Sequence, residues 1–144
     1  MTESERIIKV LGGAKFIGAG TSRFQPASPL IKQGIKFAAL LHLKKQYGLS
    51  DDFAQRVLAV SQRTWARREA DSQLNVVESD RLYRLARVIA RTEETFGSHE
   101  KASLWLKEPN RALGLQTPLS LLDMDEGARQ VEDVLIRIEH GVFS

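Results

Sequence analysis

The sequence has no cysteine among its 144 residues, which excludes disulfides, thiolate metal sites and a cysteine nucleophile. It also has no apolar run near the roughly 18 residues that a membrane helix needs, and no charged-then-apolar signal segment at its start. We therefore expect one compact domain or two small ones in the reducing cytoplasm, with no part in the membrane. A hydrophobic fraction of 42% supports a packed core rather than disorder.

Charge is distributed unevenly along the chain. Residues 1–91 hold 16 Lys and Arg against 8 Asp and Glu, a net charge of +8, whereas residues 92–144 hold 5 against 10, a net charge of −5. This split indicates two faces with two kinds of partner, of which the basic one suits phosphates.

The first 28 residues are rich in turn formers and predict a poorly defined arm. A phosphate-binding loop does not fit there, because Ala19-Gly20 stands where Lys-Ser/Thr is required and Arg23 stands where a third glycine is needed. From Pro29 onward, apolar residues recur at helical spacing, which predicts an all-α fold. We expect a helix-turn-helix region over 29–75 and a second helical region over 76–144.

Capping residues mark where the expected helices begin. Ser50 and Ser61 are N-caps of two short helices, and Gly48 ends the helix before them. Asn75 with Glu78 predicts a capping box for a long helix to Phe96. A second capping box is predicted for the last helix, from Asp123 with Glu126.

Residues 50–68 have the form of a helix-turn-helix, two short helices joined by a tight turn. The second helix offers Arg and Gln, which contact guanine and adenine edges, and Ser and Thr, which reach phosphate. Two residues depart from the usual pattern: Ala59 stands at the turn where Gly is usual, and Gln55 at a position that is usually small. The candidate DNA-binding residues are Ser61, Gln62, Arg63, Thr64, Arg67 and Arg68.

The predicted long helix carries a stripe of arginines on one face, at three- and four-residue steps. The stripe suits a DNA backbone, acidic residues of a partner, or plain solvation. Its members are Arg81, Arg84, Arg87 and Arg91.

Residues for catalysis are scarce. His42, His99 and His140 lie far apart and have no metal-ligand spacing, and no Ser-His-Asp grouping occurs. We expect a protein that is not an enzyme and that takes no metal and no cofactor.

The chain ends with a charged helix end, a glycine and two apolar residues, Val142 and Phe143, before Ser144. Chain ends usually carry polar, mobile residues. An apolar end suits packing on the protein's own core, and it suits insertion into a partner's cleft equally well.

Several motifs resemble those of the Xre/MbcA/ParS antitoxins, specifically the antitoxins that pair with RES-domain toxins. Residues 63–68 and 78–82 fit the middle region of that family and residues 11–13 its arm, so the resemblance covers about residues 8–144. One departure is Lys36, where Pro often follows Gly34-Ile35. The motifs closest to the family's C-terminal toxin-binding domain are residues 109–114, 117–119, 127–132 and 137–143.

The resemblance implies a type II antitoxin. Its partner would be a RES toxin, a fold similar to ADP-ribosyltransferases, which depletes NAD⁺, and the antitoxin's tail would obstruct the toxin's active-site cleft. The family also implies a homodimer, a higher-order complex with the toxin, and repression of its own operon by binding operator DNA. The resemblance implies that the toxin-binding residues are Arg137, Glu139, His140, Gly141, Val142 and Phe143. The alternative is a free-standing helix-turn-helix transcriptional repressor whose C-terminal region serves dimerisation.

Overall fold

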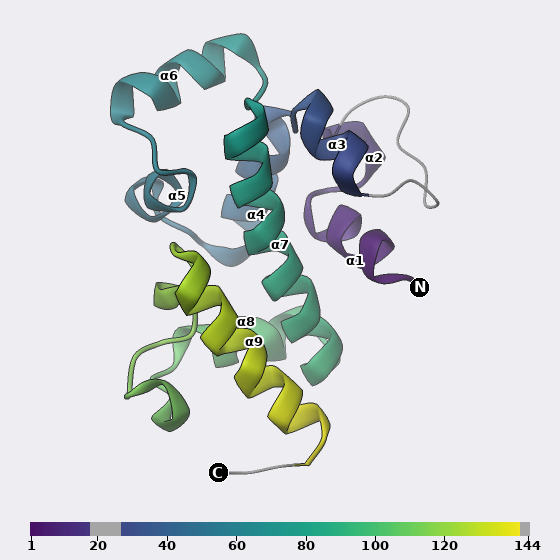
Figure 1. Cartoon of the computed structure of the whole chain (residues 1–144), viewed down its shortest axis with the longest axis vertical. Helices are drawn as coiled ribbons and strands as arrows, with labels where there is room; N and C mark the ends of the chain where they lie inside the picture. The colour runs from purple at the N-terminus through teal and green to yellow at the C-terminus, as the bar shows by residue number, and fades with distance from the viewer. Residues whose placement is uncertain (18–26, 142–144) are drawn as a thin grey trace.

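The computed structural model describes residues 1–17 and 27–141, and every named element in these ranges is a helix (Figure 1). The predicted all-α fold is confirmed. Pairing between extended segments in the described ranges is limited to two isolated bridges, Lys36 with Gln73 and Asn110 with Gln116. The elements are α1 Glu3–Val10, α2 Ala14–Ile17, α3 Ala27–Gln33, α4 Phe37–Tyr47, α5 Asp51–Leu58, α6 Gln62–Asp71, α7 Val76–Phe96, α8 His99–Lys107, the 3-10 turns η1 Arg111–Leu113 and η2 Leu119–Leu121, and α9 Asp125–Glu139.

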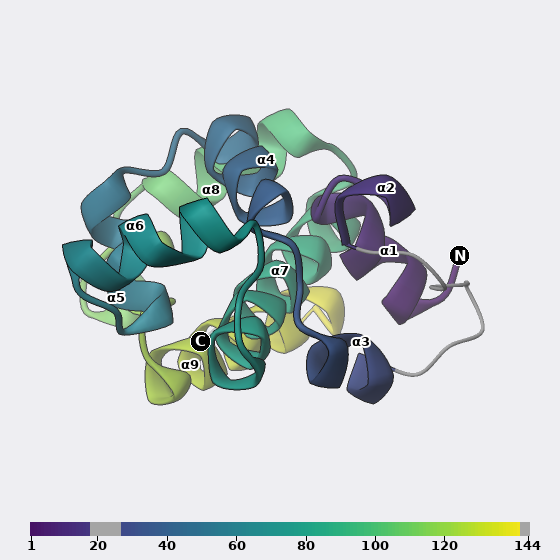
Figure 2. The same cartoon turned by 90° about the horizontal axis from the view of Figure 1, so that it is seen from above.

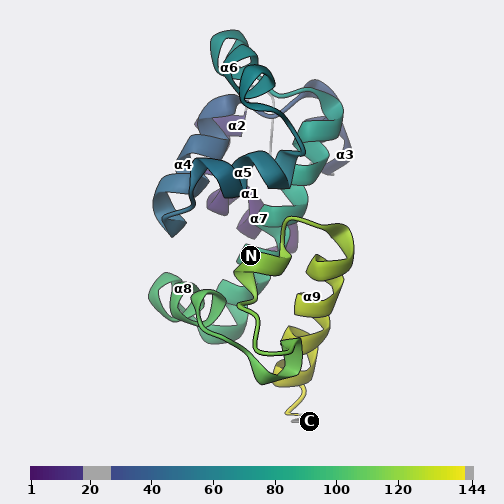
Figure 3. The same cartoon turned by 90° about the vertical axis from the view of Figure 1, so that its left-hand side faces the viewer.

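Helix α7 is the axis of the molecule, and it contacts α1, α3, α5, α8 and α9. Seen from above, α4, α5 and α6 lie on one side of it, and α1, α2 and α3 lie on the other (Figure 2). From the side, α8 and α9 lie below the helix-turn-helix (Figure 3). None of the helices in the described ranges is long and apolar enough to cross a membrane.

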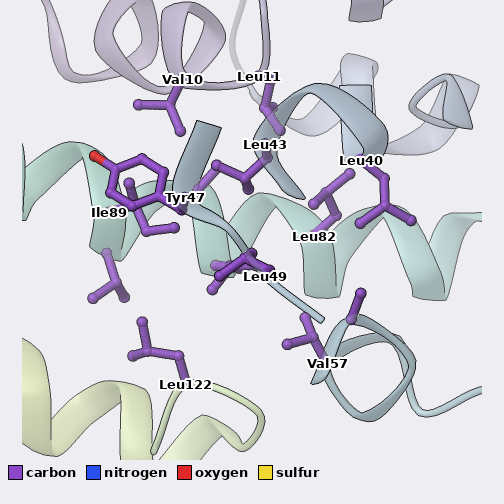
Figure 4. Close-up of a cluster of buried hydrophobic side chains, with 14 of the residues drawn as sticks. Val10, Leu11, Leu40, Leu43, Tyr47, Leu49, Val57, Leu82, Ile89 and Leu122 are labelled. Carbon is purple, nitrogen blue, oxygen red and sulfur yellow. The ribbon is translucent and has the colours of Figure 1, made fainter. Parts of the chain in front are cut away.

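One apolar core continues along α7. Leu82 and Ile89 are fully buried on this helix, where they meet Leu40 and Leu43 of α4 (Figure 4). Leu122, which precedes α9, belongs to the same cluster. The predicted division at residue 75 coincides with the N-cap of α7, and the core extends on both sides of it. Burying such side chains is the main source of stability, at about 1.5–3 kcal/mol each.

The start of the chain is more ordered than the predicted turn-rich arm. Helix α1 is capped by Thr2, whose hydroxyl accepts a hydrogen bond from the Glu5 amide at 3.1 Å. It packs against α7, with Ile7 and Leu11 buried. The apolar spacing of Ile7, Val10 and Leu11 is typical of a helix, but the glycines of this segment obscured it. Residues 18–26 of the predicted arm lie outside the described residues.

The caps around the helix-turn-helix are as predicted. Gly48 ends α4 in the left-handed conformation, with φ of 62°, and the Ser50 and Ser61 hydroxyls accept hydrogen bonds from the amides of Phe53 and Thr64. The capping box of Asn75 and Glu78 is present in both directions. These local devices depend only on neighbouring residues, which is why sequence predicts them well.

The second predicted capping box, of Asp123 with Glu126, is wrong. The N-cap of α9 is Met124, which has no side-chain cap. Asp123 instead forms an ion pair with Arg56 of α5, at 3.4 Å between Oδ2 and Nε. The Asp123 carboxylate, which the local pattern assigned to capping, pairs instead with a residue that is distant in sequence.

Candidate functional site

The helix-turn-helix consists of α5 and α6, which are joined at Ala59. Ala54 and Leu58 of α5 are buried, and so is Trp65, which is the buried residue of α6. The Trp65 ring packs edge-on against Phe37 of α4, with 5.1 Å between ring centroids. Because α6 buries so little, most of its surface faces solvent at one end of the molecule (Figure 1).

Three of the candidate DNA-binding residues are exposed on this outer surface. Gln62, Arg63 and Arg67 are exposed on the first two turns of α6. Ser61 and Thr64 are engaged with each other as the N-terminal cap, with 3.2 Å between their hydroxyl oxygens. Arg and Gln at the N-terminal end of an exposed helix are placed as base-reading side chains are in helix-turn-helix proteins.

Arg68 lies apart from the other candidates, because it turns inward. Its Nε donates to Glu78 Oε1 at 2.6 Å, and its side chain also pairs with Asp71. The hydrogen bond to Glu78 is the largest cause of the raised pKa of Arg68. Arg68 therefore fastens α6 to the start of α7.

The two departures from the usual helix-turn-helix pattern are accommodated locally. Ala59 adopts the left-handed conformation, with φ of 55° and ψ of 48°, a region that glycine occupies at lower cost. The Gln55 amide donates to Gln62 Oε1 at 2.5 Å. The larger residue at position 55 thus orients the first side chain of α6.

Arginines of the stripe on α7 form ion pairs with acidic residues of the same chain. None of the three interpretations of the stripe from sequence included this arrangement. Arg87 forms two hydrogen bonds with Glu132, at 3.2 and 3.1 Å. Arg84 and Arg91 pair with Asp125 and Glu139 at 3.8 and 3.6 Å. The acids recur at seven-residue steps along α9, so α7 and α9 are joined by a row of ion pairs.

Arg81, the first arginine of the stripe, faces the helix-turn-helix. Its guanidinium donates to the carbonyl of Leu58 at 2.8 Å. That carbonyl lies in the last turn of α5, where backbone acceptors have no partner within the helix. The stripe as a whole holds α5 and α9 to the central helix.

The end of α9 presents the described part of the predicted toxin-binding site. Arg137, His140 and Gly141 are exposed, and Gly141 leaves the helix with φ of 68°. Glu139 turns back to α7, where it accepts from the Thr95 hydroxyl at 2.8 Å and pairs with Arg91. Val142 and Phe143 lie outside the described residues.

A shallow groove of about 360 Å³ lies beside Arg137, between α9 and the turn η1. Leu113 and Val134 form its buried floor, and Gln130 and Asp133 line its rim. This groove could not be predicted from the sequence, because it forms between segments that are separated in the chain.

A cavity of about 470 Å³ lies between α1, α4, α7 and α8. The hydroxyl of Tyr47 donates to Glu93 there, and the Tyr47 ring lies edge-on to His99, with 4.6 Å between centroids. Burial, followed by the bond to Glu93, raises the pKa of Tyr47. Because its charged groups are of both signs, this cavity does not favour one ligand charge.

The two candidate surfaces lie far apart. Helix α6 crosses one end of the long axis, and α9 ends at the other (Figure 1). The fold therefore defines a helix-turn-helix protein with an appended helical unit, in which the exposed helix α6 and the exposed end of α9 do not obstruct each other.

Comparison with known families agrees with this division. Residues 26–87 match the antitoxin Xre-like helix-turn-helix domain, and residues 91–141 match the antitoxin Xre/MbcA/ParS C-terminal toxin-binding domain. The chain therefore has an Xre-like helix-turn-helix domain and an Xre/MbcA/ParS C-terminal domain, as its motifs indicated.

The relatives that the chain matches are also named as antitoxins. The chain is 37% identical over 91 residues to an antitoxin Xre of Photorhabdus laumondii, which covers 62% of each protein. It is 41% identical over 76 residues to an antitoxin Xre of Pseudomonas putida, which covers 53% of this chain and 48% of that protein. The matches thus span less than two thirds of these relatives. A Prs ADP-ribosylating antitoxin of Sphingobium sp. is 29% identical over 92% of this chain and 96% of its own length.

Proposed function

We propose that this protein neutralises a RES-domain toxin that degrades NAD⁺, and that its C-terminal tail blocks the active-site cleft of the toxin. The observation that carries the proposal is the free end of α9. There Arg137, His140 and Gly141 are exposed, in the part of the chain that matches a toxin-binding domain. Glu139, Val142 and Phe143 complete the proposed toxin-binding set. The protein works by binding rather than by catalysis.

The relatives support a toxin that uses NAD⁺. The name of the Sphingobium relative refers to ADP-ribosylation, a reaction class for which NAD⁺ is the ordinary donor.

We further propose that α6 binds operator DNA in the cytoplasm and that the protein acts as a homodimer on its own operon. Gln62, Arg63 and Arg67 are the exposed side chains that read DNA, while Ser61 and Thr64 place the helix N-terminus near phosphate. Since α6 and the end of α9 lie at opposite ends, one molecule can bind DNA and toxin together (Figure 1).

Co-expression with the RES-domain toxin tests the proposal. We expect a stable complex on size-exclusion chromatography, and NAD⁺ in the cells that stays at the level of toxin-free cells. A protein that binds DNA tightly but forms no complex and leaves NAD⁺ depleted is instead the second candidate, a free-standing repressor. The exposed arginines of α6 favour this second candidate, because DNA binding by these side chains requires no toxin.

A further inference from the structure

Glu139, in the last turn of α9, has two partners on α7. Its Oε1 accepts from the Thr95 hydroxyl at 2.8 Å, and its Oε2 lies 3.6 Å from the guanidinium of Arg91. Thr95 and Arg91 are one helical turn apart, so they approach Glu139 from the same face of α7. These contacts join the end of α9 to α7 one residue before the tail begins.

A carboxylate is unfavourable where Glu139 lies, because the C-terminus of a helix carries partial negative charge. The local sequence therefore gives no reason for an acid at this position. The contacts with Thr95 and Arg91 give one, since they compensate the charge and hold a turn that would otherwise fray.

The Thr95 hydroxyl has a second acceptor within reach. Its oxygen is 2.9 Å from the carbonyl of Arg91, one turn back on the same helix. A hydroxyl has a single proton, so it donates to that carbonyl or to Glu139 at any moment. The bond to Glu139 shares this proton with the backbone carbonyl, and its effect is on the direction in which the Glu139 side chain points.

We propose that Thr95 and Arg91 are positioning residues for the inhibitory tail. They hold Glu139 on α7 and so set the direction in which the chain leaves α9 at His140. The proposal rests on the proposed function, and it gives Glu139 a role within the antitoxin besides its proposed contact with the toxin. If the exit of the chain from α9 is fixed at His140, binding costs less conformational freedom there, and this strengthens the complex without adding a contact.

A double-mutant cycle with the tail tests this proposal. Thr95→Val keeps the shape of the side chain and removes the hydroxyl. We expect it to weaken the toxin affinity of the full chain about 3- to 10-fold, the range for loss of one hydrogen bond that orders a segment. In a chain truncated after Glu139, the same substitution should leave affinity unchanged. Thr95→Ser, which keeps the hydroxyl, should restore full affinity.

Thr92→Val is the matched control. The Thr92 hydroxyl makes the same bond to the carbonyl one turn back, that of Val88, at 2.7 Å. We expect the full chain with this substitution to bind toxin as wild type does. An equal effect of Thr95→Val in both backgrounds, or no effect in either, overturns the positioning role. If truncation itself leaves toxin affinity unchanged, the tail mechanism fails, and the positioning role fails with it.

Discussion

Arg68 and Glu78 are joined by a hydrogen bond of 2.6 Å between Nε and Oε1, and this bond ties α6 to the first turn of α7. The Glu78 carboxylate, which is buried, also accepts from the Asn75 amide at 3.0 Å. One side chain therefore caps the central helix and anchors the exposed one. Since α6 buries only Trp65 among its own residues, this anchor accounts for much of its attachment.

Replacing Glu78 with alanine should lower the free energy of unfolding by about 2–3 kcal/mol, because it removes a cap and leaves Arg68 without its main partner. Urea unfolding followed by circular dichroism measures the change. Asp80→Ala, at an exposed position of the same helix, is the control and should change stability by less than about 0.5 kcal/mol. Equal losses in the two variants would argue against the anchor.

The turn of the helix-turn-helix offers a stabilising substitution. Ala59 has φ of 55°, a conformation that costs a residue with Cβ about 1 kcal/mol. Ala59→Gly should raise the free energy of unfolding by up to about 1 kcal/mol, reduced by the greater freedom of glycine in the unfolded chain. Thermal unfolding checks this, with Ala66→Gly in the exposed middle of α6 as a control that should destabilise. A fall in stability for Ala59→Gly would contradict the argument.

The two tyrosines should resist ionisation. Burial is the first cause of the raised pKa of both Tyr47 and Tyr83. Above the ordinary tyrosine pKa of about 10, the folded state holds protons that the unfolded state has released, so stability falls as the pH rises. Ultraviolet absorbance should therefore show little tyrosinate near pH 10 in the folded protein. Ionisation of either tyrosine at its ordinary pKa, without unfolding, would disprove this.

DNA binding and toxin binding should be separable by substitution. Arg63→Ala and Arg67→Ala should each weaken operator binding by about 1–3 kcal/mol if the arginine contacts a base, or reduce the salt dependence by about one counterion if it contacts phosphate. Neither should alter protection from the toxin, because α6 lies at the far end of the molecule. Lys101→Ala, an exposed cation on α8, is the control and should leave DNA affinity unchanged. Loss of toxin protection in either arginine variant would refute the separation.

Local signals in the sequence predicted much of this fold. The caps Ser50, Ser61 and Asn75 and the left-handed Gly48 depend on a few adjacent residues, and the structure confirms them. The apolar spacing of α7 likewise predicts its buried face. Short motifs in the C-terminal part carried the family resemblance, and this resemblance predicted the class of protein.

Long-range pairing could not be predicted in the same way. Asp123 satisfies a capping pattern, yet it pairs with Arg56, which lies on another helix. The arginines of α7 have helical spacing whether they face DNA, solvent or α9, so the spacing alone does not identify their partners. The partners of Glu139 were missed for the same reason, since nothing adjacent in the sequence marks Thr95 or Arg91 as their place of contact.

The central claim is that the tail beyond Glu139 neutralises the toxin. The most direct measurement is the survival of cells that express the RES-domain toxin together with the antitoxin truncated after Glu139. Helix α9 and its buried Val131 and Leu135 are retained in this variant, so the fold should persist, and circular dichroism can verify it. The account predicts that the folded, truncated protein no longer protects the cells. Protection equal to that of the full chain would contradict it.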